Sequence, residues 1–310
     1  MRAVIAGGSG FIGRALTSYL LAQNWQVTVL TRSQRHSLPA GAAFALWPGS
    51  SGQGSLTWAQ VLEGASALIN LAGASIAGKR WSEQYKQTIL ESRLHSTRRL
   101  VEAIAGLPDN QRPRVLINAS AVGYYGSRGE EPLTEDSSPG HDFLSQVCIA
   151  WEKEALRAEE HGTRVVLLRT GMVLAKDVGA LPRLLLPFHL YVGGRTGSGR
   201  QWMSWIHIQD LVRLIYFLLC HPQASGPFNA VAPRPVTNME FCRIAARVLK
   251  KPAWLPQPEF VLRLLLGEMA DSLLLASQRA LPERALEKGF VFAYPDLIQA
   301  LQAIFQKSTG

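Results

Sequence analysis

The sequence predicts an α/β protein built on a doubly wound parallel sheet. Apolar stretches of strand length alternate with stretches of helical periodicity, beginning with a strand over Arg2–Ala6, a helix over Arg14–Gln23 and a strand over Gln26–Thr31. A glycine-rich turn, GGSGFIG, follows the first strand directly. Strands that alternate with helices form parallel sheets with right-handed crossovers. These observations predict a Rossmann fold.

The alternation continues to about residue 170 and then changes. We expect further elements over Ala67–Leu71 (strand), Ser82–Ala105 (helix), Val115–Ala119 (strand), Phe143–His161 (helix) and Arg164–Thr170 (strand). Beyond Gly171, prolines and glycines interrupt the pattern, although strands over Ser204–Ile208 and Pro227–Val231 are expected to return to the first lobe. The pattern predicts a nucleotide-binding domain over residues 1–175, with returning segments near 204–232, and a smaller C-terminal lobe over 176–310 that mainly binds substrate.

Composition narrows the class of protein. With 310 residues, 47% of them hydrophobic and 18% charged, the chain has the composition of a folded globular enzyme. The net charge of +9 is scattered, and no basic block of five or six residues indicates nucleic-acid binding. The longest apolar run, Leu214–Cys220, is far shorter than the roughly 20 residues of a membrane span.

The cysteines and the start of the chain indicate a cytoplasmic protein. Cys148, Cys220 and Cys242 are too few and too widely spaced for a disulfide framework or a metal site, so we expect a reducing compartment and no metal. The opening MRAVIAGGSG lacks the pattern of a signal peptide.

The glycine-rich turn predicts a dinucleotide site. Gly7 permits a tight turn, Gly10 lets the backbone approach a pyrophosphate, and Gly13 allows the helix to pack closely on the strand. Phe11 and Ile12 open the helix, whose amides and positive dipole end attract phosphate. The alternative is a tight turn without a ligand.

The end of the second strand favours NADP(H) over NAD(H). An acidic residue there would accept hydrogen bonds from the ribose 2′-hydroxyl, whereas an arginine suits a 2′-phosphate. The residues present are Thr31 and Arg32, followed by Ser33 and Arg35. Arg32 as an exposed loop residue is the alternative.

Ordered motifs along nearly the whole chain resemble one family. They are GGSGFIG (7–13), NLAG (70–73), KRW (79–81), SR (92–93), SAVGYYG (120–126), WE (151–152), LLRTGMVL (167–174), GSGRQWMSWIHIQD (197–210) and NAVAPRPVTNMEF (229–241). Together they resemble the atypical branch of the extended short-chain dehydrogenase/reductases, a branch of NAD(P)-dependent epimerase-like and cell-division-inhibitor-like proteins.

The resemblance implies further cofactor contacts. Leu71, Ala72 and Gly73 would line the adenosine side, and Val173 would lie near the nicotinamide. Arg93 stands where typical extended members have an asparagine, and an inward-facing arginine there would reach a phosphate or an anionic substrate. A surface helix arginine is the alternative.

The superfamily's tyrosine and lysine pair is missing. None of the seven tyrosines has a lysine four residues later, and Cys148 and Glu152 take the places of the pair. Ser120 remains near the usual serine, and Tyr124 or Tyr125 on the same loop is the candidate proton donor. Aromatic packing in a turn is the alternative for the two tyrosines.

Roles are also expected for two further groups of residues. His207 and Asp210 resemble an acid/base pair, but we interpret Asp210 as a helix N-cap and His207 as structural. A substrate lid is predicted in the glycine-rich segment Gly193–Trp205, and a packed loop with surface arginines is the alternative. The candidate substrate residues are Arg195, Arg200 and Trp202 in this segment and Trp81 outside it.

The sequence therefore supports two functions. The first is an NADP(H)-binding oxidoreductase or epimerase-like enzyme that acts on a small, anionic substrate. The second is a non-catalytic NADP(H)-binding sensor or partner-binding protein, which the missing tyrosine and lysine favour.

Overall fold

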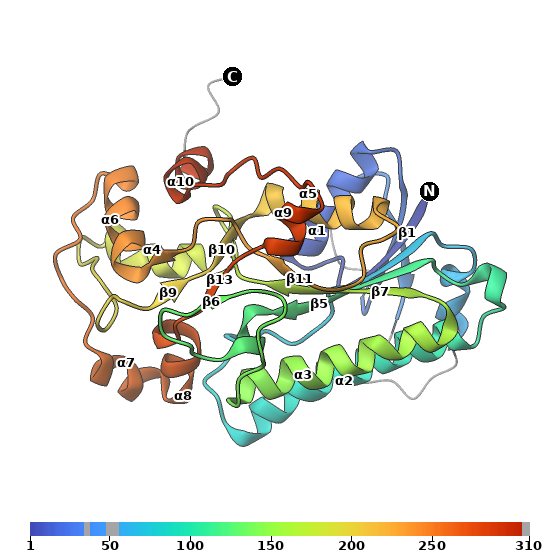
Figure 1. Cartoon of the computed structure of the whole chain (residues 1–310), viewed down its shortest axis with the longest axis horizontal. Helices are drawn as coiled ribbons and strands as arrows, with labels where there is room; N and C mark the ends of the chain where they lie inside the picture. The colour runs from blue at the N-terminus through green and yellow to red at the C-terminus, as the bar shows by residue number, and fades with distance from the viewer. Residues whose placement is uncertain (34–37, 48–55, 306–310) are drawn as a thin grey trace. The chain divides into compact units, whose positions relative to one another are not determined.

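A seven-stranded sheet forms the centre of the fold. The computed structural model of the chain describes residues 1–33, 38–47 and 56–305. The sheet has the order β11-β7-β5-β4-β1-β2-β3, and β1 pairs in parallel with both β2 and β4 (Figure 1). Its strands are β1 (Arg2–Ala6), β2 (Gln26–Thr31), β3 (Ala43–Leu46), β4 (Ala67–Asn70), β5 (Val115–Ala121), β7 (Arg164–Thr170) and β11 (Gly226–Ala230). The predicted Rossmann fold is confirmed.

Helices cover both faces of this sheet. On one face α2 (Glu83–Ala105) and α3 (Phe143–Leu156) run side by side, and the indole nitrogen of Trp151 donates a hydrogen bond of 2.8 Å to the hydroxyl of Thr97 (Figure 1). On the other face lie α1 (Phe11–Ala22) and α5 (Ile208–Cys220), whose Tyr19 and Tyr216 rings pack edge to face. The doubly wound arrangement follows from this placement.

Element boundaries differ from the expected ones where backbone chemistry decides them. The first helix begins at Phe11, three residues early, because the extended Gly10 serves as its N-cap. The helix expected to reach His161 ends at Leu156 and continues as a short 3-10 turn, which stops at Gly162 in the left-handed conformation. The edge strand β3 was not predicted, because three of its four residues are exposed and it lacks an apolar alternation.

The chain forms two compact units, each composed of several segments. The first unit comprises residues 1–120, 147–168 and 212–228, and the second comprises 121–146, 169–211 and 229–310. The first unit holds a buried apolar cluster, which includes Val4, Leu68, Leu116 and Val165 from the sheet strands and Leu100 from α2.

The second unit contains most of the remaining elements. Its helices are α4 (Leu181–His189), α6 (Asn238–Leu249), α7 (Glu259–Leu266), α8 (Glu268–Ala270), α9 (Glu283–Glu287) and α10 (Leu297–Phe305). Its short strands are β6 (Pro132–Leu133), β8 (Met172–Leu174), β9 (Trp202–Met203), β10 (Trp205–His207), β12 (Val236–Thr237) and β13 (Arg279–Ala280). β10 pairs with β8 in a separate two-stranded sheet, whereas β11 joins the large sheet.

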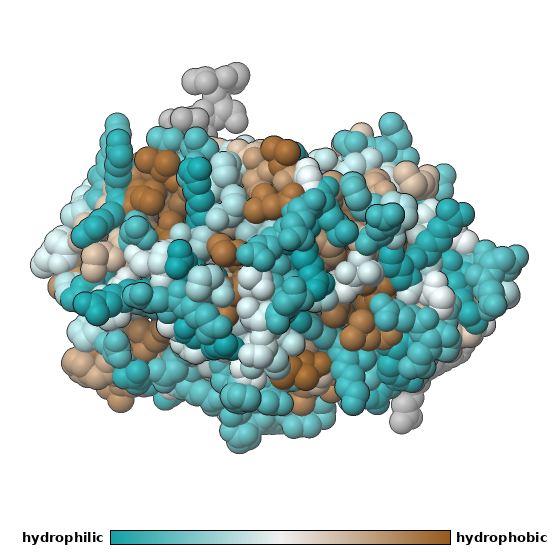
Figure 2. Space-filling model, in the orientation of Figure 1, coloured by the Kyte–Doolittle hydropathy of each residue, from teal (hydrophilic) through white to brown (hydrophobic). Residues whose placement is uncertain are grey.

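One face of the molecule is predominantly polar. Hydrophilic side chains dominate the face drawn in Figure 2, with hydrophobic areas scattered between them. Among the described residues, no helix is both long and apolar enough to cross a membrane.

Candidate functional site

Two glycines of the turn after β1 are required by the fold itself. Gly7 has a φ of +77°, and a Cβ atom there would lie 2.7 Å from the backbone of Leu71. At Gly13, a Cβ atom would lie 2.4 Å from the Cα of Gly8. Both positions bring backbone segments into direct contact, so any side chain would disrupt the first unit.

Gly10 differs, because the fold leaves space at this position. A Cβ atom there would have one close neighbour, the carbonyl oxygen of Gly7, at 3.2 Å. Gly10 caps α1 without a side chain, and Phe11 and Ile12 in the first turn are half-buried. The turn thus offers an open backbone surface at a helix N-terminus, which fits the phosphates of a dinucleotide.

A buried hydrogen-bond network fixes the loop after β4. The Asn70 side chain accepts a hydrogen bond from the Ala72 amide at 3.1 Å and donates to Thr97 and Asn118 at 2.9 and 2.7 Å. The Leu71 amide donates to the carbonyl of Ala6 in β1 at 2.9 Å. The backbone of the predicted adenosine-side residues is therefore held against the glycine turn.

Arg93 lies beneath that loop. Its guanidinium donates to the carbonyls of Ala74 and Ile89 at 3.1 and 3.0 Å and stacks on the Trp151 ring. Gly73 is close enough that a Cβ atom would lie 3.1 Å from the guanidinium carbon. Burial lowers the pKa of Arg93, although the nearby Cys148 and Tyr85 side chains act to raise it. Within the described part of the chain no carboxylate pairs with Arg93, so its charge suits an anion.

The carboxyl end of β2 carries Thr31 and Arg32, the residues predicted to select NADP(H). Thr31 is buried and its hydroxyl donates to the carbonyl of Ser33 at 3.0 Å, while Arg32 is exposed. Arg35 lies outside the described residues. A cleft of about 250 Å³ opens beside this turn, and its lining residues are Thr31, Ser33, Leu38, Pro39, Ala40, Gly41, Ala42 and Phe44.

Ser120 is paired with an acid of α3. Its hydroxyl donates a hydrogen bond of 2.6 Å to the carboxylate of Glu152, and each residue is only 5% exposed. Cys148, one turn earlier on α3, is also buried. From the sequence we expected Glu152 only as the replacement of the lysine, and we did not predict its hydrogen bond with Ser120. The four-residue spacing between Cys148 and Glu152 was the signal that placed Glu152 on this face of the helix.

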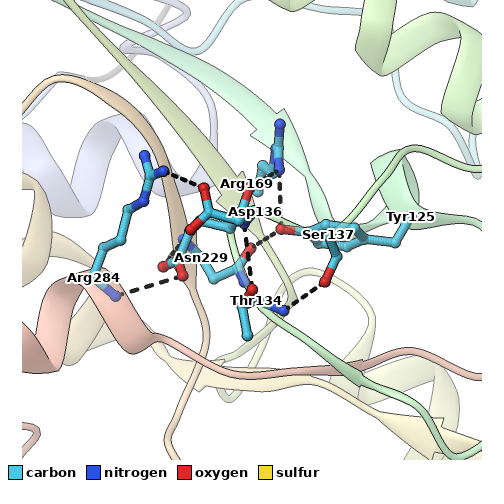
Figure 3. Close-up of polar contacts among 8 residues, drawn as sticks. Tyr125, Thr134, Asp136, Ser137, Arg169, Asn229 and Arg284 are labelled. Carbon is cyan, nitrogen blue, oxygen red and sulfur yellow. Dashed lines mark hydrogen bonds and ion pairs between the residues drawn. The ribbon is translucent and has the colours of Figure 1, made fainter.

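Tyr125 belongs to a buried cluster of the second unit (Figure 3). Its hydroxyl donates to the side-chain oxygen of Asn229 at 2.7 Å and accepts from Arg169 at 3.1 Å. Arg169 also donates to the carbonyl of Glu135, whose carboxylate accepts from the Asn229 amide. Burial raises the pKa of Tyr125 to about 12, despite the lowering effect of Arg169. The ring itself is 0% exposed, which suits a structural role.

Tyr124 has a different environment within the same unit. It is half-buried, and the guanidinium carbon of Arg169 lies 3.5 Å from the centre of its ring. The two tyrosine rings pack edge to face at 5.3 Å. Arg169, Asn229 and Glu135 were missed from the sequence, although an arginine near the end of the apolar strand RVVLLRT was a visible signal.

The other candidate residues of the second unit lie in well-packed segments. Val173 sits in β8 opposite Ile206 of β10. The ring of Trp202 is half-buried and carries the Arg279 guanidinium at 4.5 Å, so one face of that ring is covered.

The predicted lid is packed against the rest of its unit. The Thr196 amide donates to the Asn238 side chain at 2.8 Å, and Gly194 lies so near Leu255 that a Cβ atom could not be placed. The side chains of Arg195 and Arg200 are exposed. In the first unit, the indole nitrogen of Trp81 donates to the carbonyl of Ile76 at 2.8 Å.

The N-cap predicted at Asp210 is wrong. The helix α5 begins at Ile208, and Asp210 lies in its first turn. Its carboxylate accepts hydrogen bonds from the amides of Ala293 and Tyr294 at 2.9 and 2.8 Å, because the C-terminal segment competes for this acceptor. His207 accepts from the Gln209 amide and stacks on Tyr294, and burial lowers its pKa. Its structural interpretation agrees with these contacts.

Comparison with known proteins identifies the family. Residues 3–231 match the NAD dependent epimerase/dehydratase family, and residues 257–304 match a domain of unknown function, DUF1731. The chain belongs to the NAD dependent epimerase/dehydratase family. The resemblance found in the motifs is thereby confirmed.

Three relatives of this epimerase family cover almost the whole chain. A chloroplastic epimerase family protein of Arabidopsis thaliana is 43% identical over 99% of this chain and 87% of its own length. An epimerase family protein of Bacillus subtilis is 41% identical over 98% of both chains. The crystal structure of the human epimerase family protein SDR39U1 with NADPH has a TM-score of 0.86 at 35% identity, over 98% of this chain and 99% of the human one.

Proposed function

We propose that this epimerase-family chain is an NADP(H)-dependent oxidoreductase or epimerase-like enzyme acting on a small, anionic substrate. One observation supports the cofactor: a side chain would have space at Gly10, whereas a Cβ atom at Gly7, Gly8 or Gly13 would lie within 3.0 Å of a neighbouring atom. A ligand-binding turn needs that difference, whereas a plain tight turn does not. The human relative crystallised with NADPH supports the same cofactor.

The proposed cofactor contacts follow the carboxyl edge of the sheet. The pyrophosphate would lie at Gly10, Phe11 and Ile12, and the adenosine half at the end of β2 and the loop after β4. Arg93 would supply a positive charge beneath that loop. Val173, the remaining cofactor candidate, is proposed for the nicotinamide end.

Arg32→Asp is expected to narrow or invert the preference for NADPH over NADH. The exposed guanidinium would otherwise pair with the 2′-phosphate, and a carboxylate would repel it. We expect the ratio of the two dissociation constants to change by at least about tenfold, corresponding to about 1.4 kcal/mol. Fluorescence titration with both cofactors measures it, and Arg243→Asp, an exposed arginine on α6, is the control for charge. Equal affinities of the parent protein for NADPH and NADH would contradict the assignment.

The proposed substrate residues are Arg195, Arg200 and Trp202 in the second unit and Trp81 in the first. The two exposed arginines favour an anionic substrate, since among these residues they alone carry charge. We further propose the 176–310 region as mainly substrate-binding and a reducing cytoplasm as the location, consistent with the three free cysteines.

A turnover screen tests the enzymatic function. The parent protein is mixed with NADPH and a panel of aldehydes, ketones, keto acids and nucleotide sugars, and with NADP⁺ and the corresponding alcohols. Absorbance at the nicotinamide band reports hydride transfer. We expect at least one compound to give turnover that requires the protein and is lost in Gly10→Val.

A second function is a non-catalytic NADP(H)-binding sensor. The observation that favours it is the buried Tyr125, whose hydroxyl is engaged by Asn229 and Arg169. Tight NADPH binding together with no hydride transfer to any compound of the panel would support the sensor and contradict the enzyme.

A further inference from the structure

The hydrogen bond between Ser120 and Glu152 determines what Ser120 offers to a ligand. In this 2.6 Å contact the Ser120 hydroxyl is the donor and a carboxylate oxygen of Glu152 is the acceptor. Such charge-assisted bonds are short and strong. With its proton directed at Glu152, Ser120 has lone pairs left for a ligand. It is therefore an acceptor, suited to a hydroxyl group.

The strand order places Ser120 on the nicotinamide side of the proposed dinucleotide. β2, which carries Thr31 and Arg32, lies on one side of β1, and β4 followed by β5 lies on the other. With the adenosine half at β2 and the pyrophosphate at β1, the remaining half extends toward β4 and β5. Ser120 is the second-last residue of β5. Because β4 lies between β5 and β1, Ser120 is two strand spacings from β1, about 10 Å.

We propose that Ser120 and Glu152 together take up the proton of a substrate hydroxyl during dehydrogenation. This inference rests on the proposed oxidoreductase function. The substrate carbon gives its hydride to NADP⁺, the substrate hydroxyl gives its proton to the Ser120 oxygen, and the Ser120 proton passes to Glu152. The products are a carbonyl compound, NADPH, an unchanged serine and a neutral Glu152. Carbonyl reduction runs through the same steps in reverse.

The surroundings of the pair agree with this role. A separate buried hydrogen bond, from Trp151 to Thr97, already holds α3 against α2. The bond between Ser120 and Glu152 is therefore not needed to hold this helix in place. Ser120 and Glu152 are each 5% exposed and lie within the first unit, so their hydrogen bond is shielded from bulk water. Ser120 would be the residue that touches the substrate, and Glu152 would act through it.

We call this proton transfer, from the substrate hydroxyl to Ser120 and from Ser120 to Glu152, the relay. Four variants and a chemical rescue test it, using a compound of the panel that gives turnover. We expect Glu152→Ala to lower kcat at least about 100-fold, the lower range of general acid/base contributions, while NADPH affinity stays within about twofold. Sodium formate should then restore about a tenth or more of the lost rate, because a small carboxylate can enter the space left by the side chain. Ser120→Ala should lose activity without rescue, and Ser120→Thr should retain it. Glu154→Gln, two residues away and paired with Arg98 and Arg157, should behave as the parent.

Each result decides for or against the relay. Full activity in Glu152→Ala, or a loss that formate does not restore, would overturn it, since a purely structural bond gains nothing from a free carboxylate. Glu152→Gln, which preserves the side-chain volume, covers the case in which the alanine variant does not fold; near-parent kcat in that variant would also overturn the relay. No hydride transfer by the parent contradicts the proposed function as well, whereas turnover that survives the Glu152 variants contradicts the relay alone.

Discussion

Gly10→Val is expected to abolish NADPH binding in a protein that remains folded. The valine side chain would fill the open surface at the N-terminus of α1, where the pyrophosphate is proposed to lie, while the carbonyl oxygen of Gly7 is 3.2 Å from the Cβ position. We expect at least about a 100-fold weaker dissociation constant, which corresponds to about 2.7 kcal/mol. Fluorescence titration measures the affinity, and circular dichroism with a thermal melt measures folding.

Gly13→Val is the matched control within the same turn. A Cβ atom there would lie 2.4 Å from the Cα of Gly8 and 2.5 Å from the carbonyl oxygen of Gly7, so the backbone of the first unit must move. This variant should lose stability as well as cofactor binding. If Gly10→Val stays folded and keeps its NADPH affinity, the glycine turn is not the binding site.

Tyr125→Phe is expected to destabilise the protein by about 2 kcal/mol. Removal of the hydroxyl leaves Asn229 without a donor and Arg169 without one of its acceptors, both in buried positions. Urea unfolding followed by circular dichroism measures the free energy of unfolding. A change below about 0.5 kcal/mol would show that the cluster of Figure 3 does not depend on this hydroxyl.

Tyr124→Phe is the partner experiment, and it separates chemistry from stability. The ring of Tyr124 keeps its contact with Arg169 when the hydroxyl is removed, so stability should stay within about 0.5 kcal/mol of the parent. If Tyr124 is the proton donor, Tyr124→Phe should lose turnover while its stability stays normal. The Ser120 and Glu152 relay predicts that turnover persists.

Local patterns predicted the sheet well and its irregular parts poorly. Buried strands such as Arg2–Ala6 and Arg164–Thr170 are continuous apolar runs bounded by polar or glycine residues, and their bounds were predicted correctly. The edge strand β3 was missed although its sequence, AFAL, is also apolar, and three of its four residues are exposed to solvent. The start of α1 depends on a glycine cap without a side chain, which no capping pattern reveals.

The predicted site residues could be located from motifs, but their partners could not. The glycine spacing predicted the close backbone approaches that Gly7 and Gly13 make in the structure, whereas the role of Gly10 toward a dinucleotide stays a prediction. The partners of Ser120 and Tyr125 are 32 and 104 residues away along the chain, and only the fold brings them within hydrogen-bond distance. The same holds for Asp210, whose backbone partners lie 83 and 84 residues later.

The interleaving of the two units affects how the protein can be divided. The chain passes from one unit to the other at five places, after residues 120, 146, 168, 211 and 228. Arg169 and Asn229 are the first residues after two of these passages, and Tyr125 follows closely on a third. A protease that cuts one connection therefore leaves four others, and the nicked chains should migrate together until a denaturant is added. Neither unit can be expressed as one uninterrupted piece of the gene, so a fragment that holds one unit has to join its three separate segments with linkers.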